Sequence, residues 1–181
     1  DSRTACLDFY ASNYDFGAVE PCDSCCVYPT FEIDFDFNYD TLSYHKDSLY
    51  VLAGGDTLQI RGFNLVLSNF LFLDASDEYR IIDTVIFNGE VILDDYLLVR
   101  SNRSGSIVVG HTNYEADFNA VNVNIGFDPG INNDDAITRF VTSSQLRLAL
   151  DSMYNEELMT LNKFETDIVL AGDSINLSLD N

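Results

Sequence analysis

Phe31-Glu-Ile-Asp-Phe-Asp-Phe-Asn-Tyr-Asp40 alternates apolar and polar side chains through five full periods. A period of two residues is that of a β-strand, whose successive side chains point to opposite faces of the sheet. The stretch therefore predicts a strand with an aromatic face that is buried and an acidic face in water. The acidic face carries Glu32, Asp34, Asp36 and Asp40. Such a ladder can hold a cation or a basic partner, but it is more often a solvated face.

Further strand candidates follow along the chain, separated by Gly-, Asp- and Asn-containing turns. They are residues 48–52, 57–63, 65–73, 80–87, 90–99, 106–110, 120–127, 167–170 and 174–179. Asn88-Gly89 between two apolar runs is typical of a two-residue hairpin turn. Many short strands at this spacing predict an all-β fold, an antiparallel β-sandwich.

The region from Asp134 to Asn162 lacks the two-residue period. Its apolar residues are spaced irregularly, and Ser143 or Ser144 could cap a helix that runs on from them. We therefore expect a short helical insertion, or a long structured loop, before the last two strands.

All four cysteines lie near the start of the chain, in a segment rich in acids, amides and glycine. Clustered cysteines suggest the cross-linking of a piece too small to be held by burial, and hence an oxidising, extracytoplasmic compartment. We expect residues 1–29 to form a disulfide-stapled module and residues 30–181 to form the sandwich. Adjacent Cys25 and Cys26 are not expected to bond each other, because the small ring strains the peptide between them. Cys6 then pairs with Cys25 or Cys26, and Cys22 takes the other.

The chain has 30 acidic and nine basic residues and a formal net charge of −21. This balance argues against a nucleic acid or an anionic membrane as partner, because both attract clustered Lys and Arg. Divalent cations are the natural counter-charge, unless the acidic surface serves only solubility. No apolar run approaches the roughly 18 residues of a membrane span. We read the start at Asp1 as a mature or trimmed one, which leaves room for a lipid anchor upstream.

No catalytic signature stands out. The sequence lacks a nucleophile motif, and its cysteines look structural. Adjacent pairs of acidic residues are expected by chance in a chain with 30 of them, so these pairs are weak evidence for a glycosidase. The expectation is a protein that is not an enzyme.

Oxygen-rich segments make metal binding the better prediction. Asp128, Asn132, Asn133, Asp134 and Asp135 crowd around one turn, a density that suits calcium, although an Asx-rich turn that caps its own backbone has the same composition. For softer metals the credible side chains are His45, His111, Met153 and Met159; the alternative is two surface histidines.

Six sites share the pattern Asp, then Ser or Thr, then an aliphatic residue or Met. They are Thr41, Ser48, Thr57, Thr84, Ser152 and Ser174. The pattern resembles the acceptor motif for protein O-glycosylation in Bacteroidota. Ordinary turn residues ahead of a strand have the same pattern.

The spacing Cys6-x-Asp8-x-x-Ala11-x-Asn13-Tyr14-Asp15-x-x-Ala18, with Ser24-Cys25 as its ending, resembles a short cysteine module of secreted Bacteroidota proteins. The resemblance implies a Cys6–Cys25 bond, which leaves Cys22 to Cys26. Asp8, Asn13 and Asp15 would then be gathered in one ring, where their oxygens could share a calcium ion or cap the turn at Gly17.

Residues 31–39, 58–73, 79–83 and 122–128, leading to Asn132, resemble the MbnP-like family of extracytoplasmic β-sandwich proteins. The resemblance implies a copper-binding periplasmic or surface protein, often paired with a dihaem cytochrome peroxidase. It also implies a copper site that depends on a modified tryptophan, whereas this chain has no Trp and carries Ile137-Thr-Arg-Phe-Val-Thr142 in the corresponding place. The resemblance therefore supports the fold more than the copper chemistry.

Together these features predict a non-enzymatic, extracytoplasmic metal-binding domain of a lipoprotein in the periplasm or at the cell surface, anchored at the outer membrane. The charge balance favours calcium over copper as the ion. The alternative is an accessory interaction subunit of a larger outer-membrane assembly with no retained metal site. In both readings a protein partner is expected, nucleic acid is not, and membrane contact is limited to a lipid anchor.

Overall fold

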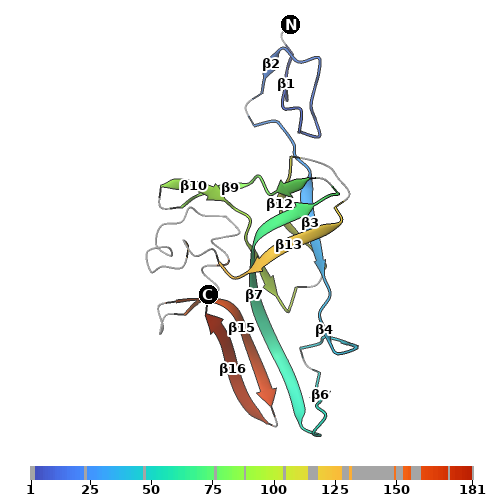
Figure 1. Ribbon diagram of the computed structural model, residues 1–181, viewed down its shortest axis with the longest axis vertical. Coiled ribbons are helices and arrows are strands. Elements are labelled where there is room, and N and C mark those ends of the chain that lie inside the picture. Colours follow the sequence, from blue (N-terminus) through green and yellow to red (C-terminus); the bar gives the residue numbers. More distant parts are fainter. Residues whose placement is uncertain are drawn as a thin grey trace.

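The computed structural model describes residues 3–22, 24–46, 48–75, 77–87, 89–103, 105–113, 118–127, 131, 149, 153–155, 160–170 and 172–180 (Figure 1). In chain order its strands are β1 (Thr4–Ala5), β2 (Glu20–Pro21), β3 (Thr30–Phe35), β4 (Asn38–Tyr39), β5 (Leu42–Ser43), β6 (Tyr50–Val51), β7 (Thr57–Leu73) and β8 (Glu78–Arg80). They continue with β9 (Thr84–Phe87), β10 (Glu90–Leu93), β11 (Leu97–Arg100), β12 (Gly105–His111), β13 (Ala120–Ile125), β14 (Tyr154–Asn155), β15 (Thr160–Leu170) and β16 (Asp173–Asp180). The predicted all-β class is confirmed.

The 17-residue strand β7 organises the main sheet. Its first half pairs with β15 along one edge and its second half pairs with β13 along the same edge. The other edge carries β6, then β11, then β8. Figure 1 shows β7 running from the lower end of the molecule up through the sandwich, with the β15–β16 hairpin beside its lower part.

The structure joins two predicted strands, 57–63 and 65–73, into the single strand β7. Two β-bulges take up the changes of register in its pairing with β15 and β13 without ending the strand. Opposite β15 the extra residue is Arg61, and opposite β13 it lies at Asn69, whose φ is +58°. The second bulge shifts the alternation of side chains by one residue. Leu67 before it and Phe70 and Phe72 after it therefore belong to the same core cluster.

That cluster confirms the aromatic face of the first predicted strand. Phe31, Ile33 and Phe35 of β3 pack on the main sheet, and β12 pairs with β3 to complete the second layer. The 31–40 strand ends earlier than expected, at Phe35, and a short β4–β5 hairpin follows.

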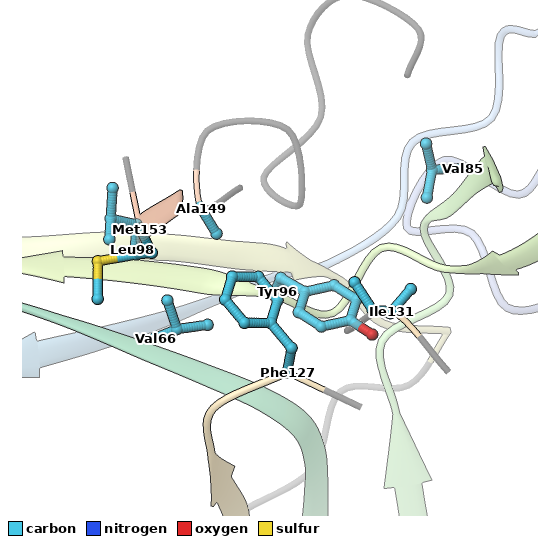
Figure 2. Close-up of a cluster of buried hydrophobic side chains, with 8 residues drawn as sticks. All are labelled: Val66, Val85, Tyr96, Leu98, Phe127, Ile131, Ala149 and Met153. Carbon is cyan, nitrogen blue, oxygen red and sulfur yellow. The ribbon is translucent and has the colours of Figure 1, made fainter. Parts of the chain in front are cut away.

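A second cluster lies around Tyr96, with Val66 and Leu98 from the main sheet and Phe127 beside them (Figure 2). Val66 alternates with Leu67, so the two clusters occupy opposite faces of β7. Central strands buried on both faces explain why 65–73 reads as a nearly continuous apolar run.

The Asn88-Gly89 hairpin prediction is confirmed. β9 and β10 pair antiparallel with Phe87 opposite Glu90, and Gly89 has a φ of +84°. The predicted strands 80–87 and 90–99 are each divided, however, because residues 81–83 and 94–96 leave the sheet. The helical insertion predicted between Asp134 and Asn162 is not seen as an element of the structure, although the described residues Ala149 and Met153 within that region have helical backbone. Most of that region lies outside the described residues, and its described end contains β14 and the start of β15.

The cysteine module holds the bonds Cys6–Cys26 and Cys22–Cys25, with Cα–Cα distances of 5.0 Å and 5.6 Å. The expectation that Cys25 and Cys26 do not bond each other is confirmed. The Cys6–Cys25 pairing implied by the resemblance is wrong, and so is Cys22–Cys26.

The reason lies in how Asn13 holds the chain beside it. Its amide donates to the Cys25 carbonyl at 2.7 Å and accepts from the Val27 N–H at 2.8 Å. Side chains of adjacent residues point to different sides of the chain. In this register Cys26 therefore meets Cys6, which is fully buried, and Cys25 is left to Cys22.

Candidate functional site

His111, the last residue of β12, is held by the carboxylate of Asp83. The His111 backbone N–H donates to Asp83 Oδ2 at 2.5 Å, and the ring Nδ1 lies 3.0 Å from Asp83 Oδ1. A backbone bond from Ile82 N–H to the His111 carbonyl, at 2.9 Å, keeps the two segments together.

Gly110 makes this close approach feasible. A Cβ at this position would lie 2.6 Å from Asp83 Oδ2 and 2.7 Å from Ile81 Cγ2. The pairing of β12 with β3 is also irregular between Val108 and Gly110. A bulge of this kind commonly re-aims a side chain at the end of a strand.

His111 and Asp83 line an open cleft of about 590 Å³ between the sandwich and the cysteine module. The module side of the cleft contains Val27 and Tyr28. The Tyr28 hydroxyl donates to Asp8 Oδ2 at 2.6 Å, which ties the link between the two parts to the module. This bond lowers the pKa of Asp8, with help from the Tyr10 N–H, and it raises the pKa of Tyr28.

The geometry suits an imidazole that binds a ligand. With Nδ1 facing a carboxylate, Nε2 is the ring nitrogen left for another atom, and the His111 side chain is 49% exposed. Metal-bound histidines almost always make this kind of bond through their other nitrogen, which fixes the tautomer and the ring orientation. The same bond also joins two chain segments, a purely structural role.

The two histidines do not meet. His45 lies in the turn between β5 and β6, where its N–H donates to the Tyr50 hydroxyl at 2.8 Å. His111 ends β12, and Figure 1 shows β6 and β12 in well-separated parts of the molecule.

The acidic turn predicted as a calcium site lies outside the described residues. This covers its ligand candidates Asp128, Asn132, Asn133, Asp134 and Asp135. Ile131, within the same turn, is described and belongs to the core cluster around Tyr96.

Asp8, Asn13 and Asp15 already have protein partners. Asp8 accepts from Tyr28 and Tyr10, and Asn13 holds the chain around Cys25. Asp15 accepts from the Gly17 N–H at 2.9 Å and pairs with Arg3 at 2.9 Å. The contact between Asp15 and the Gly17 N–H corresponds to the alternative in which these side chains cap the turn at Gly17.

Copper prefers thiolate, thioether and imidazole ligands, and the described residues supply only some of these. All four cysteines are in disulfides, Met153 is 1% exposed inside the core, and Met159 lies outside the described residues. Within the described ranges no group of three or more His, Cys, Asp or Glu side chains converges. Among the described residues His111 is thus a single oriented imidazole.

The ladder of acids on β3 behaves as a solvated face. Glu32, Asp34 and Asp36 are exposed, and Glu32 accepts from the Ser106 hydroxyl at 2.7 Å across to β12. Of the predicted glycosylation sites, Thr41, Thr84 and Ser174 are exposed and Ser48 and Thr57 are half-buried. Ser152 lies outside the described residues, and modification at all six stays a prediction.

Sequence reasoning missed Asp83 and Tyr28. Each of them is far in sequence from the residue that it contacts, so no local motif contains both. Asp83 is 28 residues from His111, and Tyr28 is 20 residues from Asp8. Only the pairing of β12 and the closure of the cysteine module bring these groups together.

The comparisons with known proteins cover the sandwich. A family model described as MbnP matches residues 28–164, a span that begins at Tyr28 and ends inside β15. Neither the comparison with curated proteins nor that with solved structures finds a match. In the part of the chain that the structure describes, no helix is long and apolar enough to cross a membrane.

Proposed function

The chain belongs to the MbnP family, and from that premise we propose that it is a non-enzymatic, extracytoplasmic metal-binding domain with His111 as a metal ligand. The observation that carries the proposal is the Asp83–His111 pair in an open cleft. Two disulfides and no free cysteine among the described residues fit an oxidising compartment. Attachment to the outer membrane through a lipid upstream of residue 1 is part of the same proposal.

An imidazole ligand favours copper over calcium at this cleft, because calcium takes oxygen ligands. Asp83 would hold the orientation of the ring, while His111 Nε2 would supply the bond to the metal. Calcium remains the ion proposed for the acidic turn that includes Asp128 and Asp135. The two ions therefore call for different residues, and one experiment separates them.

We expect isothermal titration of chelator-stripped protein with copper to show binding that His111→Ala abolishes. Asp83→Asn should weaken it by about tenfold or more, the usual effect of losing the group that orients a ligating histidine. His45→Ala is the matched control and should bind as the parent does.

Equal losses in His45→Ala and His111→Ala, or no heat with copper at micromolar levels, would contradict the assignment to His111. Calcium binding that His111→Ala leaves intact would place the ion on the acidic turn instead.

A second candidate function, an accessory subunit of a larger outer-membrane assembly, is favoured by the surface of the cysteine module. Phe16 is 90% exposed, Phe9 76% and Val19 72%, and Tyr10 stands edge-on to Phe9 at a centroid distance of 6.0 Å. Phe9 also lies 5.6 Å from the Tyr14 ring, and exposed aromatic residues on a small module are typical of protein interfaces.

We expect the chain, isolated at native expression levels, to co-purify with a partner that a Phe9→Ser, Phe16→Ser double variant no longer retains. A Val91→Ser variant is the control, since Val91 is 69% exposed on β10, away from the module. Migration of the native protein as a lone monomer would remove this candidate.

A further inference from the structure

The two disulfides of the cysteine module differ in span and in access from solvent. Cys22–Cys25 joins cysteines that are three residues apart, in the sequence Cys22-Asp-Ser-Cys25, whereas Cys6–Cys26 spans a separation of 20. Cys25 is exposed and Cys22 is half-buried, while Cys6 is fully buried. A thiol in solution therefore reaches the Cys22–Cys25 bond more readily than the Cys6–Cys26 bond.

Contacts other than the bond itself hold both cysteines of this accessible pair. Cys22 directly follows β2, and its N–H donates to the carbonyl of Ala5 in β1 at 3.1 Å. The Cys25 carbonyl accepts from the Asn13 amide at 2.7 Å. The other disulfide joins the direct sequence neighbours of Ala5 and Cys25. When the accessible bond opens, its two thiols therefore stay close together, and the bond can form again.

The loop that this bond closes contains a strained residue. Ser24 has a φ of +62°, in the left-handed region that residues other than glycine rarely adopt. Such conformations persist only where the surrounding structure enforces them, and they are concentrated at functional and switching sites. Opening the bond removes one of the constraints on Ser24, which favours the reduced form.

We propose that Cys22–Cys25 is a redox-active disulfide that accepts two electrons from a dithiol of a partner protein. Exposed disulfides are typically the labile ones, and the rate of exchange depends on access of the attacking thiolate. Cys6–Cys26 is the structural bond, which keeps the module folded during the exchange. The accessible pair is separate from the proposed metal site, since neither Cys22 nor Cys25 lines the cleft at His111.

The exchange has two steps. One thiolate of the dithiol attacks the sulfur of Cys25, the more exposed residue, and forms a mixed disulfide, while Cys22 leaves as a thiolate and takes up a proton. The second thiolate of the dithiol then attacks the partner's own sulfur in the mixed disulfide, and Cys25 leaves and is protonated. Two electrons and two protons thus pass from the dithiol, which becomes a disulfide, to the cysteine pair.

Acidic residues near the pair determine which side supplies the nucleophile. Glu20 and Asp23 lie within two residues of Cys22 in the sequence. Negative charge nearby disfavours the thiolate form of a cysteine. The partner dithiol therefore supplies the attacking thiolate, and Cys22–Cys25 is the acceptor.

The test treats the full chain with dithiothreitol and, separately, with reduced thioredoxin, which is a protein dithiol. Free thiols are blocked with N-ethylmaleimide at successive times, and fragmentation mass spectrometry locates the label on each cysteine. With both reductants we expect Cys22 and Cys25 to be labelled about tenfold faster than Cys6 and Cys26, or more, because access governs the rate. Replacing the reductant with oxidised glutathione should restore the bond and end the labelling.

Hydrogen exchange on the selectively reduced protein separates this exchange from unfolding of the module. Protection should persist at the Ser12 and Asp15 amides, which bond to the carbonyls of Val27 and Cys6. The Cys22→Ala, Cys25→Ala variant is the control, and it should take up no label over the same period, because only the disulfide at the buried Cys6 remains.

Equal labelling rates for the two bonds, or rapid labelling of the control variant, would overturn the proposal. Loss of protection at Ser12 and Asp15 as Cys22–Cys25 is reduced would do the same, because the bond would then be structural. Reduction by dithiothreitol alone would also overturn it, since such a bond does not exchange with a protein dithiol. Selective and reversible reduction by both reagents supports the site.

Discussion

Phe72→Ala should lower the free energy of unfolding by about 3–5 kcal/mol, the usual range for removing a buried aromatic ring. Phe72 is fully buried, and its ring centroid lies 3.7 Å from that of Phe31 and 5.4 Å from that of Phe118. The substitution therefore opens a cavity between the two layers and removes the ring contact between Phe31 of β3 and Phe72 of β7. Urea unfolding followed by tyrosine fluorescence measures the change.

Phe16→Ala is the control, because it removes the same atoms from a side chain that is 90% exposed. Its effect should stay within about 0.5 kcal/mol of the parent. Similar losses for the two variants would mean that the β3 layer does not pack on the main sheet as described.

Removing the Cys6–Cys26 bond with a Cys6→Ala, Cys26→Ala double variant should unravel the cysteine module and leave the sandwich folded. The bond joins residues 20 apart in sequence, and the chain-entropy estimate for such a loop is about 3 kcal/mol. The module buries few apolar side chains of its own, with Cys6 and Ala11 the ones that are most enclosed. Hydrogen exchange should show loss of protection at the Asp15 and Ser12 amides, which bond to Cys6 and Val27.

The Cys22→Ala, Cys25→Ala variant is the matched control. Its bond spans a separation of three residues, for which the same estimate gives about 2 kcal/mol, so more of the module should survive. Loss of protection in β3 and β7 together with the module would show that the two parts unfold as one unit. The boundary predicted near residue 29 would then be wrong.

The site was harder to predict than the fold, for reasons visible in single residues. His111 could be selected as a metal ligand because histidine is rare in this chain and chemically distinctive. Its partner Asp83 could not, because 30 acidic residues offer no means of choosing one.

The sequence by itself determined the strands, because the alternation of residues 31–35 and the apolar run of 65–73 are local patterns that a pleated chain must satisfy. It also determined the Gly89 hairpin, since a tight turn with positive φ favours glycine. Only the tertiary structure decided the disulfide pairing, which follows from how Asn13 holds residues 25–27. The same holds for the continuity of β7 across its two bulges and for the cleft at His111. In each case the deciding contacts join residues far apart in the chain, and their register depends on packing that no local pattern records.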